Sequence, residues 1–418
     1  MMSPLSSKSY KVLIASTLGT LIEWAEFSFY GYLITRFSHL FFPSFSPQIA
    51  ILLALATFAI SYIARPIGAV FFGHMGDKYG RQRALVGSLL LMGCVTLAMG
   101  LLPTYQTISI TAPTLLVLLR FLQGVAMAGE FMGAGIFVVE SDPSKPYFSS
   151  SWISTAAAAG MLLGGMFGIL VSLPSMPVWA WRLPFLLGFV GCLIGFYIWR
   201  SLAETPEYQQ LLNQQRTLAT PLKTLLQNHR LPLLQTFTLS AFIGIFIYVC
   251  NIWWVTYVIE QGYFTPLAAR TLATIAQGSV VLFTPVMGML AQHWRSIPLM
   301  RLGVFTSLGV APVLLLLPGH VGFYTLLAIE LLYALGLAAL TAPMFKYLSR
   351  LFIPEVRYSG QSIGWNLGVA IFGGTAPLMA ELFVAHYSII WVIGYIVISG
   401  ILVLLLNFSF PQSRLGDR

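Results

Sequence analysis

The chain has 418 residues, of which 57% are hydrophobic and only 8% are charged, and its mean hydropathy is +0.83. A soluble domain carries roughly 25% charged residues, so this composition excludes a water-soluble fold. The formal net charge of +9 arises from basic residues that are scattered over many short polar segments. A nucleic-acid surface would gather them on one face, so we expect no nucleic-acid partner.

Twelve apolar runs are each long enough to cross a bilayer as a helix, which takes about 20 mostly apolar residues. In chain order, we expect spans at 11–37, 49–73, 84–102, 113–140, 149–172, 182–200, 231–258, 270–290, 298–317, 321–345, 358–382 and 386–410. The first run is too long for a cleaved signal peptide and carries two acids, so it should remain as the first helix. The sequence therefore predicts an all-α polytopic membrane protein.

The distribution of basic residues predicts the orientation of these spans. Seventeen of the 22 Lys and Arg residues fall on the side of the two termini, whereas Arg36, Arg182 and Arg270 fall on the opposite side. Because cytoplasmic loops carry an excess of Lys and Arg, we expect both termini to be cytoplasmic.

A polar stretch divides the predicted helices into two sets of six. It predicts an N-terminal six-helix bundle over 1–201, a cytoplasmic linker over 202–230 and a C-terminal six-helix bundle over 231–418. Two glycine ladders support a duplicated design, because they occupy corresponding helices five and eleven. They are Gly160, Gly164 and Gly168, and Gly360, Gly364 and Gly368. Small residues at every fourth position allow close helix packing in lipid, so the ladders predict packing seams.

The segment between the second and third predicted helices places one acid among cations. We expect Gly73, Asp77, Gly80 and Arg81 to form a loop cluster that holds helix ends together in one conformation and releases them in another. The alternative is a basic loop that only sets the topology.

This segment resembles the pattern G-x3-D-[RK]-x-G-R-[KR] of the major facilitator superfamily. Further segments are similar to its metabolite:proton symporter branch, which includes proline/betaine, 2-oxoglutarate, citrate and shikimate carriers. They are Glu23-Trp24-Ala25-Glu26-Phe27, Ala64-Arg65-Pro66-Ile67-Gly68, Arg120-x2-Gln123-Gly124, Trp181-Arg182-Leu183-Pro184-Phe185, Glu204-Thr205-Pro206 and Pro354-Glu355-Val356-Arg357. One departure is Ala25-Glu26, where the branch usually has Tyr-Asp.

The resemblance implies the major facilitator fold, with two pseudo-symmetric bundles and alternating access. It also implies a multi-pass protein of the plasma membrane, here a bacterial inner membrane. We expect a monomer that works with a small-molecule substrate, a proton and the lipid bilayer. We expect no cofactor, with the proton gradient as the energy source, and no metal, since Cys94, Cys192 and Cys250 lie singly in apolar runs.

Charged side chains at membrane depth cost about 2.5 to 3.5 kcal/mol on insertion scales, so they normally face a cavity or a partner. Glu23 and Glu26 share one face of the first helix, and each makes protonation of the other easier. Glu26 and Arg120 fall at similar depths. We therefore expect them to form an ion pair, in which the acid binds the coupled proton and Arg120 alternatively receives a substrate carboxylate. The competing interpretation is a permanent structural salt bridge.

Other polar and aromatic residues complete the predicted site. Glu130 and Arg65 are expected to be structural, with Arg65 anchoring a helix end. In the second half, a stripe in helix seven and groups in helices ten and eleven can line the cavity, although such stripes also arise from packing. The predicted substrate-binding residues are Arg120, Gln123, Tyr30, Asn251, Trp254, Tyr257, Glu330, Trp365 and Asn366.

Three functional classes remain to be compared. The buried acids and the branch resemblance favour proton-coupled symport of a small polar metabolite, such as an organic acid, an amino acid or a betaine-like zwitterion. The alternative is an exporter or exchanger of a larger metabolite in the same fold. An enzyme or ATP-driven pump would need a nucleotide-binding loop or a catalytic cluster, and the sequence has no G-x4-G-K-[ST] pattern.

Overall fold

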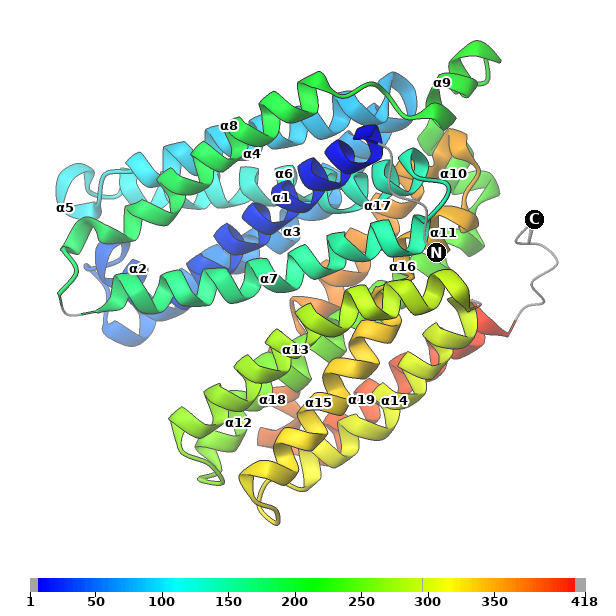
Figure 1. The fold of residues 1–418 in the computed structure, drawn as a ribbon. Coiled ribbons are helices and arrows are strands. Elements are labelled where there is room, and N and C mark those ends of the chain that lie inside the picture. Colours follow the sequence, from blue (N-terminus) through cyan, green and yellow to red (C-terminus); the bar gives the residue numbers. More distant parts are fainter. Residues whose placement is uncertain (1–6, 174, 295, 410–418) are drawn as a thin grey trace. The chain divides into compact units, whose positions relative to one another are not determined.

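A computed structural model of the chain describes residues 7–173, 175–294 and 296–409, and these ranges contain helices and no strand. The first eleven helical elements are α1 (Ser7–Tyr32), α2 (Ile34–Phe41), α3 (Pro47–Tyr79), α4 (Arg81–Leu101), α5 (Tyr105–Ile108), α6 (Thr111–Ser141), α7 (Pro146–Ser172), η1 (Val178–Arg182), α8 (Leu183–Ser201), α9 (Pro206–Asn213) and α10 (Pro221–Asn228). The remaining elements are α11 (Arg230–Ile247), η2 (Tyr248–Trp253), α12 (Trp254–Glu260), α13 (Pro266–His293), α14 (Ser296–Leu316), α15 (Phe323–Thr341), α16 (Met344–Leu351), η3 (Pro354–Val356), α17 (Arg357–Gly368), η4 (Val369–Gly373), α18 (Ala376–His386) and α19 (Ile389–Phe408) (Figure 1).

The twelve predicted membrane spans are confirmed within the described ranges. Twelve helical stretches there are long and apolar enough to cross a membrane, and each overlaps one predicted span. The end of the twelfth predicted span, at residue 410, lies outside the described residues, as do Arg295, Arg414 and Arg418, which contributed to the predicted orientation.

Several span boundaries differ from the prediction. The first helix ends at Tyr32, and the rest of the predicted span belongs to the short helix α2. The second helix continues to Tyr79, so the predicted loop from Gly73 to Tyr79 is wrong. Only Gly80 leaves the helical conformation, with a φ of 113° that favours glycine. In the second half, π-helical segments η2 and η4 interrupt the predicted spans 231–258 and 358–382.

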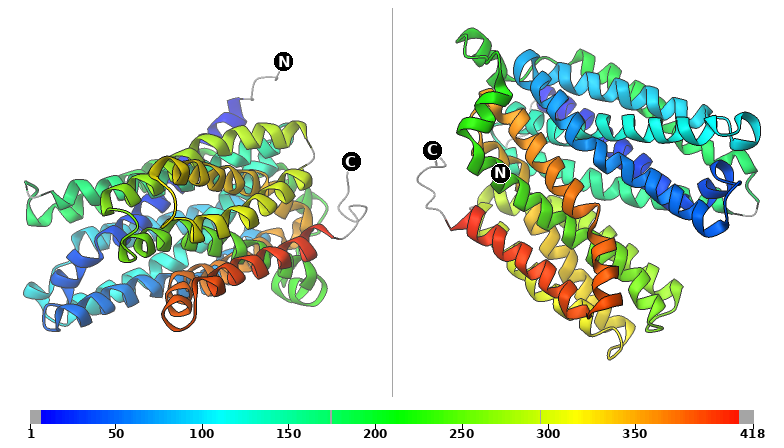
Figure 2. Two further views of the ribbon diagram at one scale, coloured as in Figure 1. Left: turned by 90° about the horizontal axis from the view of Figure 1, so that it is seen from below. Right: turned by 180° about the vertical axis from the view of Figure 1, so that it is seen from behind.

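The chain forms two compact units. One unit comprises Met1–Ser141 and Ala156–Pro221, and the other comprises Asp142–Thr155 and Leu222–Arg418. Within the first unit, α3 packs on α6 and α4 packs on both α6 and α8 (Figure 1). Within the second unit, α15 packs on α13 and α14, and α11 packs on α17 (Figure 2).

The glycine ladders lie at close helix crossings, as predicted. A Cβ atom at Gly160 would lie 2.8 Å from Cβ of Trp24, and one at Gly164 would lie 2.6 Å from the carbonyl oxygen of Ala25, so α7 contacts α1 here. In the second unit, a Cβ atom at Gly364 would lie 2.7 Å from Cβ of Thr236, so α17 contacts α11 in the same way. Both ladders are therefore packing seams.

Candidate functional site

A close crossing of α3 and α6 places two arginines in the core of the first unit. A Cβ atom at Gly68 would lie 2.8 Å from Cα of Val125, and one at Gly124 would lie 2.8 Å from Cα of Ser61. The two backbones can approach this closely only because both residues are glycines. Arg65 precedes the first of these contacts by three residues, and Arg120 precedes the second by four.

Arg120 is fully buried and surrounded by aromatic rings. Its guanidinium carbon lies 4.3 Å from the ring centre of Tyr30, 5.1 Å from that of Phe27 and 5.3 Å from that of Phe58. Nη1 donates a hydrogen bond to Oε1 of Gln123. Nε and Nη2 of Arg120, and Nε2 of Gln123, have no hydrogen-bond partner among the described residues. Arg120, Gln123 and Tyr30, three of the predicted substrate-binding residues, therefore lie together.

Arg65 lies well inside α3, so the predicted role as a helix-end anchor is wrong. Pro66 follows it without ending the helix, which continues to Tyr79. The guanidinium carbon of Arg65 lies 4.6 Å from the ring centre of Tyr62 and 4.8 Å from that of Phe27, and Nη2 donates to the sulfur of Met127 at 3.5 Å. Its Nε has no partner in the described part of the chain.

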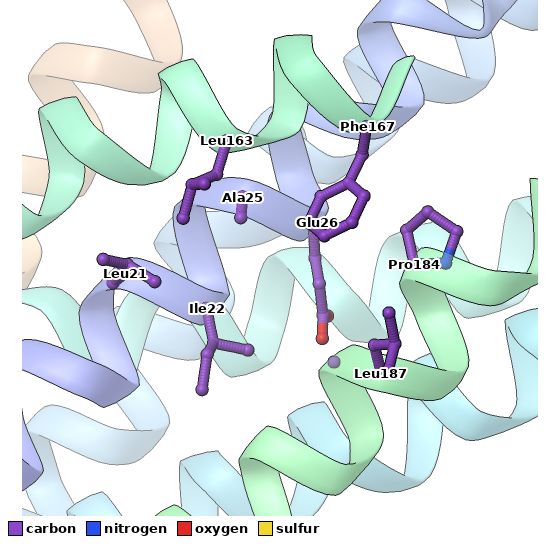
Figure 3. A pocket seen from close by; sticks show the side chains of 9 residues that line it. Leu21, Ile22, Ala25, Glu26, Leu163, Phe167, Pro184 and Leu187 are labelled. Carbon is purple, nitrogen blue, oxygen red and sulfur yellow. The ribbon is translucent and has the colours of Figure 1, made fainter. Parts of the chain in front are cut away.

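Glu26 points away from Arg120, and the predicted ion pair between them is not formed. Thr96 of α4 donates a hydrogen bond to Oε2 of Glu26 at 2.5 Å, whereas Oε1 has no hydrogen-bond partner among the described residues. The carboxylate is directed toward α8, beside Leu187, and borders a pocket of about 130 Å³ between α1, α7 and α8 (Figure 3). The position of a residue along its helix predicts its depth in the membrane, but it does not predict the direction in which the side chain points.

Two further acids lie near Glu26 in the same unit. Glu23 is buried, its Oε2 has no hydrogen-bond partner in the described ranges, and it is within electrostatic reach of Arg65, Glu26 and Glu130. Glu130 of α6 lies against Gly19 of α1. The three carboxyl groups therefore form a buried acidic group, which we call the α1 acid cluster: Glu23, Glu26 and Glu130.

In the second unit, the predicted stripe of helix seven divides between several directions. Asn251 donates a hydrogen bond to the carbonyl of Ala273 at 3.3 Å, and Trp254 donates to the carbonyl of Leu314 at 3.0 Å. Tyr257 stacks on Trp253, with 5.0 Å between ring centres. Asn251 lies within the π-helical segment η2, whereas Trp254 and Tyr257 follow it in α12, and the three side chains contact different neighbours.

The remaining predicted residues are buried in the second unit. Glu330 of α15 is completely buried, and neither carboxyl oxygen has a hydrogen-bond partner among the described residues. It lies near Cys250 and Tyr333. In α17, Trp365 and Asn366 are both buried, and the Asn366 amide donates to the carbonyl of Ser362 at 2.8 Å.

Asp77 and Arg81 form a buried ion pair at the start of α4. Nη1 of Arg81 lies 3.2 Å from Oδ1 of Asp77 and donates to the carbonyl of Gly76 at 2.8 Å. Nε of Arg81 lies 3.5 Å from Oε2 of Glu140 at the end of α6. Glu140 of α6 is therefore a member of this charge cluster, although the sequence analysis did not single it out. Gly73 is a buried residue inside α3 and is not one of the charged groups of this cluster.

The segment that follows α8 continues this network. Glu140 accepts a hydrogen bond from the hydroxyl of Thr205 at 2.6 Å, and Glu204 accepts one from the backbone amide of Gln82 at 3.1 Å. Tyr208 donates to the carbonyl of Lys78 at 2.8 Å. Burial raises the pKa of the Glu204 carboxyl above its ordinary value, and hydrogen bonds from the Thr205 and Gln82 amides oppose this shift.

Comparisons with known proteins agree with the fold. The family model described as Major Facilitator Superfamily matches residues 12–305. An inner membrane metabolite transport protein of Escherichia coli K12 is 36% identical over 93% of this chain and 90% of its own length. A proline/betaine transporter of Salmonella typhimurium LT2 is 29% identical over 97% of this chain and 84% of its own. A solved structure of a proton:xylose symporter superposes with a TM-score of 0.77 at 16% identity, covering 98% of this chain and 97% of that one.

Proposed function

The chain belongs to the major facilitator superfamily, and we propose that it carries out proton-coupled symport of a small metabolite that bears a carboxylate. Membership makes it a multi-pass secondary transporter rather than an enzyme. We assign it to a bacterial inner membrane with both termini cytoplasmic, as a monomer that needs no cofactor beyond the proton gradient.

The observation that carries the proposal is the set of unpartnered donors on Arg120. Two of its N–H-bearing nitrogens, together with the amide nitrogen of Gln123, are buried without an acceptor among the described residues. Leaving a buried charged donor unpaired costs more than leaving a neutral one, so such a site favours an anionic ligand. A carboxylate matches the planar fork of a guanidinium. The relatives include a proline/betaine transporter, and proline and betaine each contain a carboxylate.

The α1 acid cluster supplies the proposed proton site. Glu23 and Glu26 each retain an oxygen without a partner in the described ranges, and no ion pair within 4 Å joins Glu26 to Arg120. A buried carboxyl of this kind exchanges its charge by taking or releasing a proton. Since Glu26 and the ring of Phe27 are neighbours on α1, protonation and anion binding act on the same helix. Coupling then requires that both ligands favour one conformation of α1.

The network of Asp77, Arg81 and Glu140 supports a conformational role at the end of the same unit. It joins the start of α4 to the end of α6 through buried charges. We propose that it holds these helix ends together in one conformation and releases them in another, which is the latch function expected for Gly73, Asp77, Gly80 and Arg81.

The proposal is tested by uptake into vesicles that contain the purified protein. With an imposed inward proton gradient, we expect accumulation of at least one compound among proline, betaine, succinate, 2-oxoglutarate, citrate and shikimate, and its loss on adding a protonophore. Arg120→Gln should abolish uptake, whereas Arg182→Gln should retain it, because Arg182 donates only to the carbonyls of Gly100 and Leu102. Uptake of a carboxylate that ignores the gradient would contradict the proposal.

A further inference from the structure

Two buried guanidinium groups flank one aromatic ring in the first unit. The guanidinium carbons of Arg65 and Arg120 lie 4.8 Å and 5.1 Å from the centre of the Phe27 ring. We propose that the transported metabolite carries two carboxylate groups, one bound by Arg120 and the other by Arg65. This inference rests on the proposed transport function and specifies its substrate class.

Neither arginine forms a direct ion pair with a described carboxylate, although Glu23 lies within electrostatic reach of Arg65. The polar contacts of Arg65 and Arg120 are the sulfur of Met127 and the amide oxygen of Gln123, and no described carboxylate lies within 4 Å of either guanidinium as an ion pair. Glu26, the acid closest in sequence to Phe27, is held by Thr96 instead. Each guanidinium therefore retains at least one N–H donor for a ligand.

Most of the unpartnered polar groups near the two arginines are donors, although Oε2 of Glu23, within electrostatic reach of Arg65, is an unpartnered acceptor. Besides Nε of Arg65 and two nitrogens of Arg120, the indole nitrogen of Trp24 and the amide nitrogen of Gln123 have no hydrogen-bond partner among the described residues. The hydroxyl of Ser61 also has no hydrogen-bond partner among the described residues. A site of this kind needs acceptors from its ligand, and each carboxylate supplies two acceptor oxygens.

The aromatic rings favour the same ligand over a zwitterion. An ammonium group is attracted to exposed ring faces, but in this cluster the rings of Tyr30, Phe27 and Tyr62 already contact guanidinium groups. A second cation placed beside them would be repelled by two arginines. A metabolite with one carboxylate would leave one buried guanidinium unmatched.

The deciding experiment compares ligands that differ by one negative charge. In vesicles containing the purified protein, uptake of labelled succinate is measured in competition with unlabelled succinate, monomethyl succinate, butyrate, proline and betaine. We expect succinate to compete at least about tenfold better than its monomethyl ester, as the loss of one charged hydrogen-bonded contact implies. Proline or betaine competing as well as succinate would overturn the inference.

A variant locates the second contact. Arg65→Gln should weaken competition by succinate to about the level of the monomethyl ester while leaving the ester unchanged, and Arg65→Lys should retain part of the preference because it keeps the charge. Arg182→Gln is the matched control, since Arg182 also stacks on an aromatic ring, 4.5 Å from the centre of Trp181. Equal losses for succinate and ester in Arg65→Gln would contradict the assignment.

The wild-type comparison decides the inference even where a variant does not fold. The outcomes also separate it from the proposed function. Gradient-driven uptake of proline or betaine without dicarboxylate uptake contradicts only the two-carboxylate inference. Carboxylate uptake that is independent of the proton gradient contradicts only the coupling.

Discussion

The hydroxyl of Thr96 donates a hydrogen bond to the carboxylate of Glu26, with 2.5 Å between the oxygen atoms. This bond directs the acid of α1 toward α4 and α8 and away from Arg120. The proposed proton site at Glu26 of α1 and the proposed anion site at Arg120 of α6 are therefore separate. Glu26 and the substrate therefore do not compete directly for Arg120. Coupling between them instead acts through the position of α1.

Replacing Glu26 by Gln should leave substrate exchange across the membrane intact and impair substrate accumulation driven by a proton gradient. The amide keeps the shape of the side chain and can still accept a hydrogen bond from Thr96, but it cannot take up a proton at neutral pH. We expect Glu26→Gln to exchange labelled for unlabelled substrate across the membrane at a rate within about threefold of the wild type, while accumulation driven by a proton gradient falls by about tenfold or more. Thr96→Val, which removes the hydrogen bond to Glu26 and keeps the acid, is measured alongside it. Undiminished accumulation in Glu26→Gln would remove Glu26 from the proton site.

The buried ion pairs of Arg81 predict a large and non-additive loss of stability. Arg81→Met leaves Asp77 and Glu140 buried without this cation, and removing one partner of a buried pair costs about 3 to 5 kcal/mol. The unfolding temperature in detergent should therefore fall. Adding Glu140→Gln should restore part of that loss, because one unpaired charge is removed. Additive losses in the double variant would show that the two residues are not coupled.

Glu204 predicts a pH dependence of stability with a defined sign. Burial raises the pKa of this carboxyl above its ordinary value of 4.5, so the folded state binds the proton more tightly than the unfolded state. The resulting stabilisation is present below pH 4.5 and is lost as the pH rises through the folded-state pKa. Glu204→Gln stays neutral throughout and should lose less stability over this window. Thermal unfolding between pH 4 and 8 measures the difference, and parallel curves would contradict it.

The glycine ladder of α7 predicts a contrast between two equivalent substitutions. Gly160→Ala places a Cβ atom 2.8 Å from Cβ of Trp24, so α1 and α7 must separate, at a cost of about 1 to 3 kcal/mol. Gly278→Ala is the matched control, because no described atom beyond the backbone of its own helix lies within 4 Å of the added Cβ and alanine favours the helix. We expect the unfolding temperature to fall in the first variant only. Equal behaviour of both would argue against a close α1–α7 contact.

Much of the fold follows from local signals in the sequence. Apolar runs predict the twelve spans, and glycines at every fourth position predict packing seams on α7 and α17, which the structure places against α1 and α11. A charge cluster that contains Asp77 and Arg81 is also predicted from an acid placed among cations, but the sequence places it in a loop. The extension of α3 to Tyr79 is missed, because the glycine-containing segment from Gly73 to Arg81 predicts a loop, whereas within it only Gly80 adopts a positive φ.

The candidate site is less predictable because it depends on helix rotation. Depth places Glu26 and Arg120 at one level, yet the rotation of α1 about its axis decides that Glu26 meets Thr96. Pro66 after Arg65 suggests a helix end, but α3 continues past this proline, and Arg65 is buried among aromatic rings. The irregular segment η2 likewise divides the aromatic stripe of helix seven, and residue spacing alone does not reveal such segments.

Proton movement upon addition of substrate is the most direct test of the central claim. Purified protein in vesicles without any imposed gradient is mixed with an excess of succinate, and the external pH is recorded in a weakly buffered medium. We expect alkalinisation of the medium that a protonophore abolishes, and its loss in Glu26→Gln despite retained exchange of succinate. Succinate entry by the wild-type protein with no change in external pH would contradict proton-coupled symport.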